Sequence, residues 1–128
     1  MRLWITAIAM TIALSSSVYA EAESDHASTH KIRFDLDQLD EAGLYGPADG
    51  KRSLSYEFCV PYHPRAIETV QNIDPTVVVY LQSPGRIGCR RSTQVLAIGH
   101  THQPNYRQVL ANLANLEAIE RIEQFFGE

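Results

Sequence analysis

Two cysteines are the residues best suited to covalent chemistry in this sequence of 128 residues. Cys59 and Cys89 lack the C-x-x-C spacing that lowers the pKa of a thiol or prepares zinc coordination. The secretory start of the chain, described below, also favours oxidised over free thiols. We therefore predict a Cys59–Cys89 disulfide, which stabilises a small domain by roughly 3–4 kcal/mol in the chain-entropy model. The alternative is a redox or metal-binding thiol site.

A His-Thr-His tripeptide at residues 100–102 is the clearest suggestion of a metal site. Histidines two positions apart on an extended segment point the same way, so His100 and His102 can share one zinc or copper ion. Asp74 could add an oxygen ligand if the fold brings its turn to the same end of the sheet. Two imidazoles are too few for a tight site, so the alternative is a polar turn whose histidines cap a helix or bind water.

Three arginines, Arg86, Arg90 and Arg91, surround Cys89 in a glycine-containing segment. Glycines expose backbone N–H groups, and these can join guanidinium groups in binding a carboxylate or a phosphate. The alternative is a solvated hairpin tip whose positive charges offset nearby acids.

No assembled set of catalytic residues is recognisable. Ser83 and Ser92 have no histidine close by in the sequence, and neither a G-x-S-x-G nor an H-E-x-x-H motif occurs. Glu57 and Cys59 share one face of a predicted strand, which alone makes no catalytic pair. We predict no catalytic residue.

The elements that must position these residues follow from hydrophobic periodicity. Alternating or β-branched runs predict four strands, at residues 31–39, 53–60, 76–81 and 94–99. Pro64 and Pro104 suit the first turns of two helices, because the missing N–H of proline has no partner there anyway. Residues 40–52 and 83–92 contain several glycines and are predicted loops.

The two halves of the chain share one spacing. A shift of forty residues aligns Pro64 with Pro104, and it also aligns Tyr56 with Leu96, Phe58 with Ile98, Val70 with Leu110 and Ile73 with Leu113. The second half should then end in a strand near Glu117–Arg121, rather than in a helix that continues to Phe126. The fold class predicted is α+β, a ferredoxin-like split βαβ (βαββαβ) antiparallel sheet with an extra N-terminal strand and one disulfide.

This topology separates the candidate sites. Cys59 and Cys89 fall at one end of the sheet, together with the arginines. The histidine pair and Asp74 fall at the opposite end, away from His63.

The beginning of the chain has the features of a secretory signal. Arg2 precedes an apolar run from residue 3 to 14, and small residues lead to Ala20, so a signal peptide over residues 1–20 is predicted. No later segment is long enough to cross a bilayer, and no cysteine follows the cleavage site to take a lipid. Residues 21–30 are polar and predict a flexible tail. A weak metal site at His26 and His30 is the alternative there.

Composition limits the function further. The chain has 11 Lys and Arg against 15 Asp and Glu residues. Cleavage after Ala20 removes one arginine and no acid, which leaves 10 basic and 15 acidic side chains and a net charge of −5. Such a chain lacks the basic surplus of a general nucleic-acid binder. Residues 31–128 are enough for one domain with one core.

We therefore expect a secreted or periplasmic, disulfide-bridged binding module without a cofactor, whose partner is a protein of the cell envelope. Inhibitor-like and immunity-like roles are examples. The alternative is a periplasmic metal-binding protein that uses His100 and His102. The ending, in which leucines precede Ala-Ile-Glu-Arg-Ile-Glu and two phenylalanines, is similar to the closing helix and strand of small ferredoxin-like modules, including propeptide-type inhibitors of subtilisin-like proteases. The similarity assigns no functional residue.

Overall fold

A computed structural model describes residues 28–127. The predicted signal peptide (1–20) and residues 21–27 of the predicted tail, with His26, lie outside the described residues. His30 belongs to a short 3-10 helix, η1 (Thr29–Lys31). Within the described part, no helix has the length and apolar character needed to cross a membrane.

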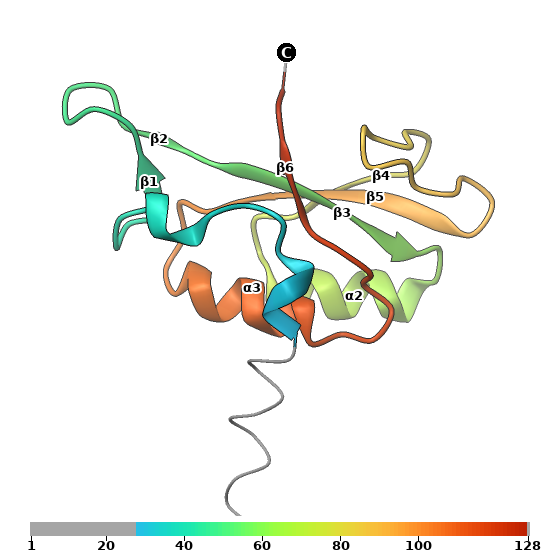
Figure 1. Cartoon of the computed structure of the whole chain (residues 1–128). Helices are drawn as coiled ribbons and strands as arrows, with labels where there is room; N and C mark the ends of the chain where they lie inside the picture. The colour runs from blue at the N-terminus through green and yellow to red at the C-terminus, as the bar shows by residue number, and fades with distance from the viewer. Residues whose placement is uncertain (1–27, 128) are drawn as a thin grey trace, which may run out of the picture.

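Residues 28–127 form an α+β structure with two α-helices and two antiparallel sheets. The main sheet has the spatial order β4-β5-β3-β6. Its strands are β3 (Ser55–Pro61), β4 (Val78–Tyr80), β5 (Gln94–His100) and β6 (Glu123–Phe125). Helices α2 (Pro64–Ile73) and α3 (Tyr106–Ala114) both lie on one face of this sheet (Figure 1). The α+β class is thus confirmed.

The main core fills the space between the sheet and the helices. Tyr56, Phe58 and Val60, which alternate along β3, are each at most 1% exposed. Strand β5 lies beside them, and Gly99 pairs with Tyr56. A Cβ atom at Gly99 would lie 2.8 Å from the Tyr56 ring, so only glycine leaves room for the tyrosine. The helices close the core with Val70, Leu110 and Leu113.

Both helices begin near the predicted prolines. Pro64 is the first residue of α2, and the ring of His63 accepts the N–H of Arg65 as a cap. Helix α3 begins two residues after Pro104, because Asn105 adopts a left-handed conformation (φ 57°) that turns the chain. Helix α3 ends at Ala114, and the closing strand β6 (Glu123–Phe125) lies after the predicted range Glu117–Arg121 and does not overlap it. The predicted break between the last helix and the last strand is confirmed.

The predicted N-terminal strand at residues 31–39 is wrong. Ile32 forms a single isolated bridge to Ile122, and no ladder continues from it within the described residues. The carboxylate of Asp35 then accepts the N–H of Asp37, which turns the chain into the 3-10 helix η2 (Leu36–Gln38). The apolar residues of this segment still pack against the main core. Their alternation therefore reflects one-sided burial of an extended segment rather than strand pairing.

The predicted loop at residues 40–52 also differs, since it contains a hairpin of β1 (Leu44–Tyr45) and β2 (Arg52–Ser53). Gly43 allows the chain to approach the main body here. Its φ is +76°, and a Cβ atom would lie 1.9 Å from the carbonyl oxygen of Thr101. The hairpin extends from the end of the sheet where β3 begins (Figure 1).

Candidate functional site

The predicted bridge is present. Cys59 alternates along β3 with Phe58 and Val60 of the main core, so it lies on the face that points away from the helices, which we call the outer face. It is bonded to Cys89, which lies thirty positions further along the sequence, and the two Cα atoms are 5.5 Å apart. Cys89 belongs to the connection between β4 and β5, of which we call residues 82–93 the arginine loop. The bridge ties the arginine loop down onto the outer face.

A second, small apolar cluster lies under the arginine loop. Ile87, Cys89 and Leu96 are its buried members, with exposed fractions of 6%, 5% and 2%. Cys59 and Ile98 are partly buried against them. The sheet therefore has apolar packing on both faces, and only the helix face of it was evident from the sequence.

Glu57 lies on the same outer face and is 1% exposed. Its Oε1 atom accepts the N–H of Ile87 at 2.7 Å, while Oε2 has no hydrogen-bond partner within the described residues. Burial raises the pKa of the Glu57 carboxyl above its ordinary value of 4.5, the N–H of Ile87 opposes this rise, and the nearby charge of Glu123 adds to it. The carboxyl thus holds the backbone of the arginine loop from beneath.

Arg121 holds the other side of the same peptide segment. Its Nη2 donates to the carbonyl oxygen of Ile87 at 2.7 Å, and its Nε donates to Glu123 at 3.0 Å. Together with Arg90 and Glu120, Arg121 lines a cleft of about 130 Å³ beside the disulfide. Sequence reasoning missed Arg121, because a single arginine in a predicted closing strand carries no signal of what it contacts.

The three predicted arginines are exposed on this fixed loop. Arg90 lies 3.7 Å from Glu120, and both side chains are mostly exposed, so the pair contributes little stability. Neither Arg86 nor Arg91 forms a salt bridge within residues 28–127. Their guanidinium groups are therefore available to carboxylate or phosphate groups from outside the described chain.

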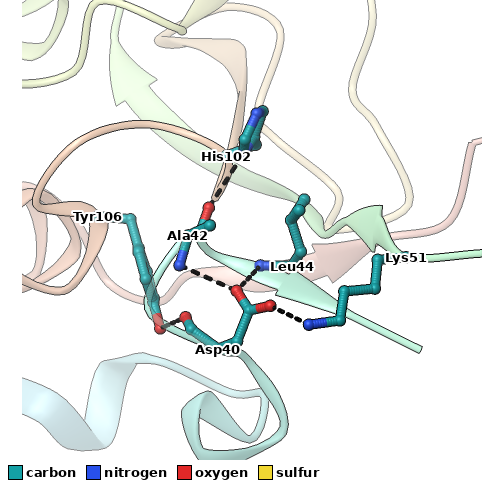
Figure 2. Close-up of polar contacts among 6 residues, drawn as sticks. All are labelled: Asp40, Ala42, Leu44, Lys51, His102 and Tyr106. Carbon is teal, nitrogen blue, oxygen red and sulfur yellow. Dashed lines mark hydrogen bonds and ion pairs between the residues drawn. The ribbon is translucent and has the colours of Figure 1, made fainter. Parts of the chain in front are cut away.

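His100 and His102 lie at the end of β5 that is farther from the arginine loop. The backbone N–H of His100 donates to the hydroxyl of Thr76, and the Nδ1 atom of His100 is buried without a partner among the described residues. The Nδ1 atom of His102 lies 3.0 Å from the carbonyl oxygen of Ala42 (Figure 2). No group of three or more histidine, cysteine, aspartate or glutamate side chains is arranged to hold a metal in residues 28–127.

Asp74 is fully buried, and its carboxylate is engaged inside the protein. The hydroxyl of Tyr56 and the hydroxyl of Thr76 donate to it, as does the side-chain amide of Gln103 at 3.0 Å. Burial, and next the adjacent Asp74 carboxylate, raise the pKa of the Tyr56 phenol above its ordinary value. The network joins the start of β3 to the end of α2.

Asp40 organises the hairpin in a similar way (Figure 2). One carboxylate oxygen accepts the N–H groups of Ala42 and Leu44, and the other accepts Lys51 at 2.7 Å. The hydrogen bond from Lys51, followed by that from Leu44, lowers the pKa of Asp40. The hydroxyl of Tyr106 donates to the carbonyl oxygen of Asp40, which ties the hairpin to α3. These contacts position the backbone and leave no carboxylate oxygen of Asp40 without a partner.

No protein-family model, curated protein or solved structure matches this chain. Its function has to be inferred from the geometry of its own residues.

Proposed function

We propose that this protein is an exported binding module of the cell envelope that meets a protein partner through the arginine loop and performs no catalysis. One observation carries this proposal: exposed arginines lie on a loop whose backbone is fixed against the sheet. The N–H of Ile87 bonds to Glu57, its C=O bonds to Arg121, and Cys89 is bridged to Cys59.

Fixing the backbone matters because binding costs conformational entropy. A flexible loop has to be ordered when its partner arrives, whereas a loop that is already ordered loses only the freedom of its side chains. Arg86, Arg90 and Arg91 therefore present a positive surface at low entropic cost, in a chain with a formal net charge of −4. The partner surface should be acidic, since guanidinium groups bind carboxylates well.

We also propose that the domain is a ferredoxin-like split βαβ unit with an added hairpin. The order of elements from β3 to β6 is strand, helix, strand, strand, helix, strand. Every pair of neighbouring strands in the main sheet is antiparallel, and the two helices share one face. These observations support the assignment.

The export proposal relies on the sequence of residues 1–20 and is compatible with the disulfide. Mass spectrometry of the protein recovered from its native cells tests it. We expect a mature chain that begins at Glu21 and carries the bridge. A chain that retains residues 1–20, or that is recovered with two free thiols, would contradict it.

The binding role is tested by capturing partners from an extract of the producing cell's envelope. The double variant Arg90→Glu/Arg91→Glu should lose the captured protein that the wild type retains. Its matched control is Arg52→Glu/Arg107→Glu, which changes the charge equally at exposed positions outside the arginine loop. Equal capture by the wild type and both double variants would rule out the arginine loop as the contact.

Metal binding by His100 and His102 is a second candidate, favoured by one contact. Metal-bound histidines commonly donate their other ring N–H to a carbonyl oxygen, and His102 Nδ1 lies at hydrogen-bond distance from Ala42 O. Zinc or copper should then raise the melting temperature, and His100→Ala should abolish the rise. An unchanged melting temperature in excess metal would end this candidate.

A further inference from the structure

The cleft beside the disulfide is bounded by polar side chains from three different segments. Arg90 comes from the arginine loop, Gln94 is the first residue of β5, and Glu120 and Arg121 belong to the segment that leads into β6. The cleft has a volume of about 130 Å³, which at about 30 Å³ for each water molecule corresponds to roughly four waters. It therefore has room for one small polar group, such as a carboxylate with its adjoining carbon atoms.

Arg121 brings to this cleft a guanidinium group that is already oriented. Its Nε donates to Glu123 at 3.0 Å, and its Nη2 donates to the carbonyl oxygen of Ile87 at 2.7 Å. Its Nη1 group has no hydrogen-bond partner within residues 28–127. A guanidinium group that is held in place before binding loses little side-chain freedom when an anion arrives. Nη1 is therefore a prepared donor on the cleft.

Gln94 and Arg90 supply further N–H donors to the same cleft. Oε1 of Gln94 accepts the backbone N–H of Arg90 at 2.8 Å, which orients the amide, and its Nε2 group has no partner in the described part of the chain. The guanidinium group of Arg90 lies 3.7 Å from Oε1 of Glu120, a distance longer than a hydrogen bond. One acceptor group in the cleft can thus meet donors from three side chains.

The charges around the cleft favour a monovalent anion. Two arginines and one glutamate, Glu120, are the charged residues that line it. Glu123 further offsets the charge of Arg121, to which it is bonded. A carboxylate, with one negative charge, matches this small positive excess, whereas a phosphate ester carries about 1.5–2 negative charges at pH 7 and exceeds it. Proteins supply carboxylates from acidic side chains and from the C-terminus.

We propose that the cleft between Arg90 and Arg121 binds one carboxylate group of the partner protein, and that this group displaces Glu120 from Arg90. The inference rests on the proposed binding role and names the chemical group and the place where it is held. Arg121 fixes the position of the carboxylate, because its guanidinium group is the one already oriented by two hydrogen bonds. Gln94 adds a neutral donor that does not attract a second anion.

Acetate is the smallest probe of this cleft, and neutral acetamide is its matched control in size. Each is titrated at constant ionic strength and followed by nitrogen-15 NMR. Acetate should cause saturable shifts in the side-chain N–H signals of Gln94 and Arg121, whereas acetamide should cause none. Inorganic phosphate should bind more weakly than acetate. No saturable shift with acetate, or tighter binding of phosphate than of acetate, would overturn the proposal.

Two blocked tripeptides identify the source of the carboxylate. Acetyl-Ala-Glu-Ala-amide carries only a side-chain carboxylate, and acetyl-Ala-Ala-Ala carries only a C-terminal one. Binding of either peptide supports the proposal, and the tighter of the two shows which kind of carboxylate the partner provides. Failure of both peptides to shift the Gln94 signal would overturn the proposal, because a protein carboxylate could then not enter the cleft.

Gln94→Glu tests the cleft while it keeps the loop in place. Glutamate retains an oxygen that can accept the N–H of Arg90, but it replaces the free N–H group by a negative charge. Asn112→Asp is the matched control, because it adds the same charge at an exposed position of α3 and keeps the oxygen that accepts Gln108. We expect Gln94→Glu to weaken acetate binding at least about tenfold and Asn112→Asp to leave it unchanged. Equal affinities of the two variants would contradict the proposal.

Glu120→Gln should have the opposite effect. It removes the carboxylate that competes for Arg90, and exposed ion pairs are weak, so acetate should bind about two- to fivefold more tightly. Unchanged or weaker binding by this variant would overturn the proposal.

Capture from the envelope extract separates the cleft from the binding role. Capture that is lost in Arg90→Glu/Arg91→Glu but survives in Gln94→Glu would overturn the cleft proposal and leave the binding role standing. Acetate binding that is lost in Gln94→Glu, without any arginine-dependent capture, would leave the carboxylate site standing and overturn the protein partner.

Discussion

Removal of the disulfide should cost this protein a large part of its stability. The bridge joins residues thirty positions apart, and the chain-entropy relation then gives about 3.6 kcal/mol of loop-closure free energy at room temperature. Domains of this size have a total free energy of unfolding of about 5–15 kcal/mol. We therefore expect the double variant Cys59→Ala/Cys89→Ala to remain folded but to lose about 3–4 kcal/mol.

Urea denaturation followed by circular dichroism measures this loss. With a slope of about 1.5–2 kcal/mol per molar urea, the midpoint should fall by about 2 M. Reductant should lower the midpoint of the wild type by a similar amount and leave that of the double variant unchanged, which provides the control. In the reduced wild type, hydrogen exchange should show that the amides of Ile87 and Cys89 lose their protection before other amides, because the bridge no longer holds the arginine loop over Glu57.

A loss below about 1 kcal/mol would contradict this expectation, because the bridge would then constrain the unfolded chain far less than its loop length requires. Two thiols that titrate in the native protein before any reductant is added would also contradict it.

Three other substitutions test separate parts of the structure. Tyr56→Phe removes a hydrogen bond to a buried carboxylate and should lower the free energy of unfolding, measured in urea, by about 1.5–3 kcal/mol. Tyr106→Phe removes a hydrogen bond to a carbonyl oxygen and should lower it by only about 0.5–1.5 kcal/mol. The raised pKa of Glu57 means that the folded state binds more protons than the unfolded state just above pH 4.5, so this group makes stability fall as pH rises through that window. Denaturation between pH 4 and 7 should show a shallower fall in the Glu57→Gln variant, and an identical slope would contradict the assignment. Gly43→Ala should lower the free energy of unfolding by about 2–4 kcal/mol, because the new Cβ atom would meet backbone atoms. Gly88→Ala is also at positive φ but faces open space, so it should lower the free energy of unfolding by only about 1–2 kcal/mol in the same assay.

The sequence was sufficient to predict elements whose local signals and tertiary packing agree. Strand β3 alternates apolar and polar residues, whereas β5 contains a continuous apolar run, and one face of each strand is buried against the helices. Pro64 begins a helix, and the internal repeat distinguished a closing strand from a longer helix. In these places the local pattern and the core favour the same structure.

The failures occur where one local pattern is compatible with two structures. The alternating segment near Ile32 packs on the core whether or not it forms a strand. Its bridge partner, Ile122, lies far along the chain, and the local pattern does not encode this pairing. The contacts of Asp74, a possible metal ligand by its sequence position, are also not encoded in the local pattern, because Tyr56 and Gln103 reach its oxygens from segments distant in sequence. The positions of Arg86, Arg90 and Arg91 on an exposed loop followed from glycine and charge, but the contacts of Arg121 that help to fix this loop did not.

The two apolar clusters lie on opposite faces of one sheet, so β3 contributes Phe58 to one and Cys59 to the other. Mutational effects in separate clusters with no shared partners add nearly independently. Residues 82–93 can therefore accumulate substitutions whose energetic effects stay confined to the smaller cluster, provided that Ile87 and Cys89 keep their contacts. This arrangement lets the arginine loop diversify in evolution while the helix-side core remains unchanged.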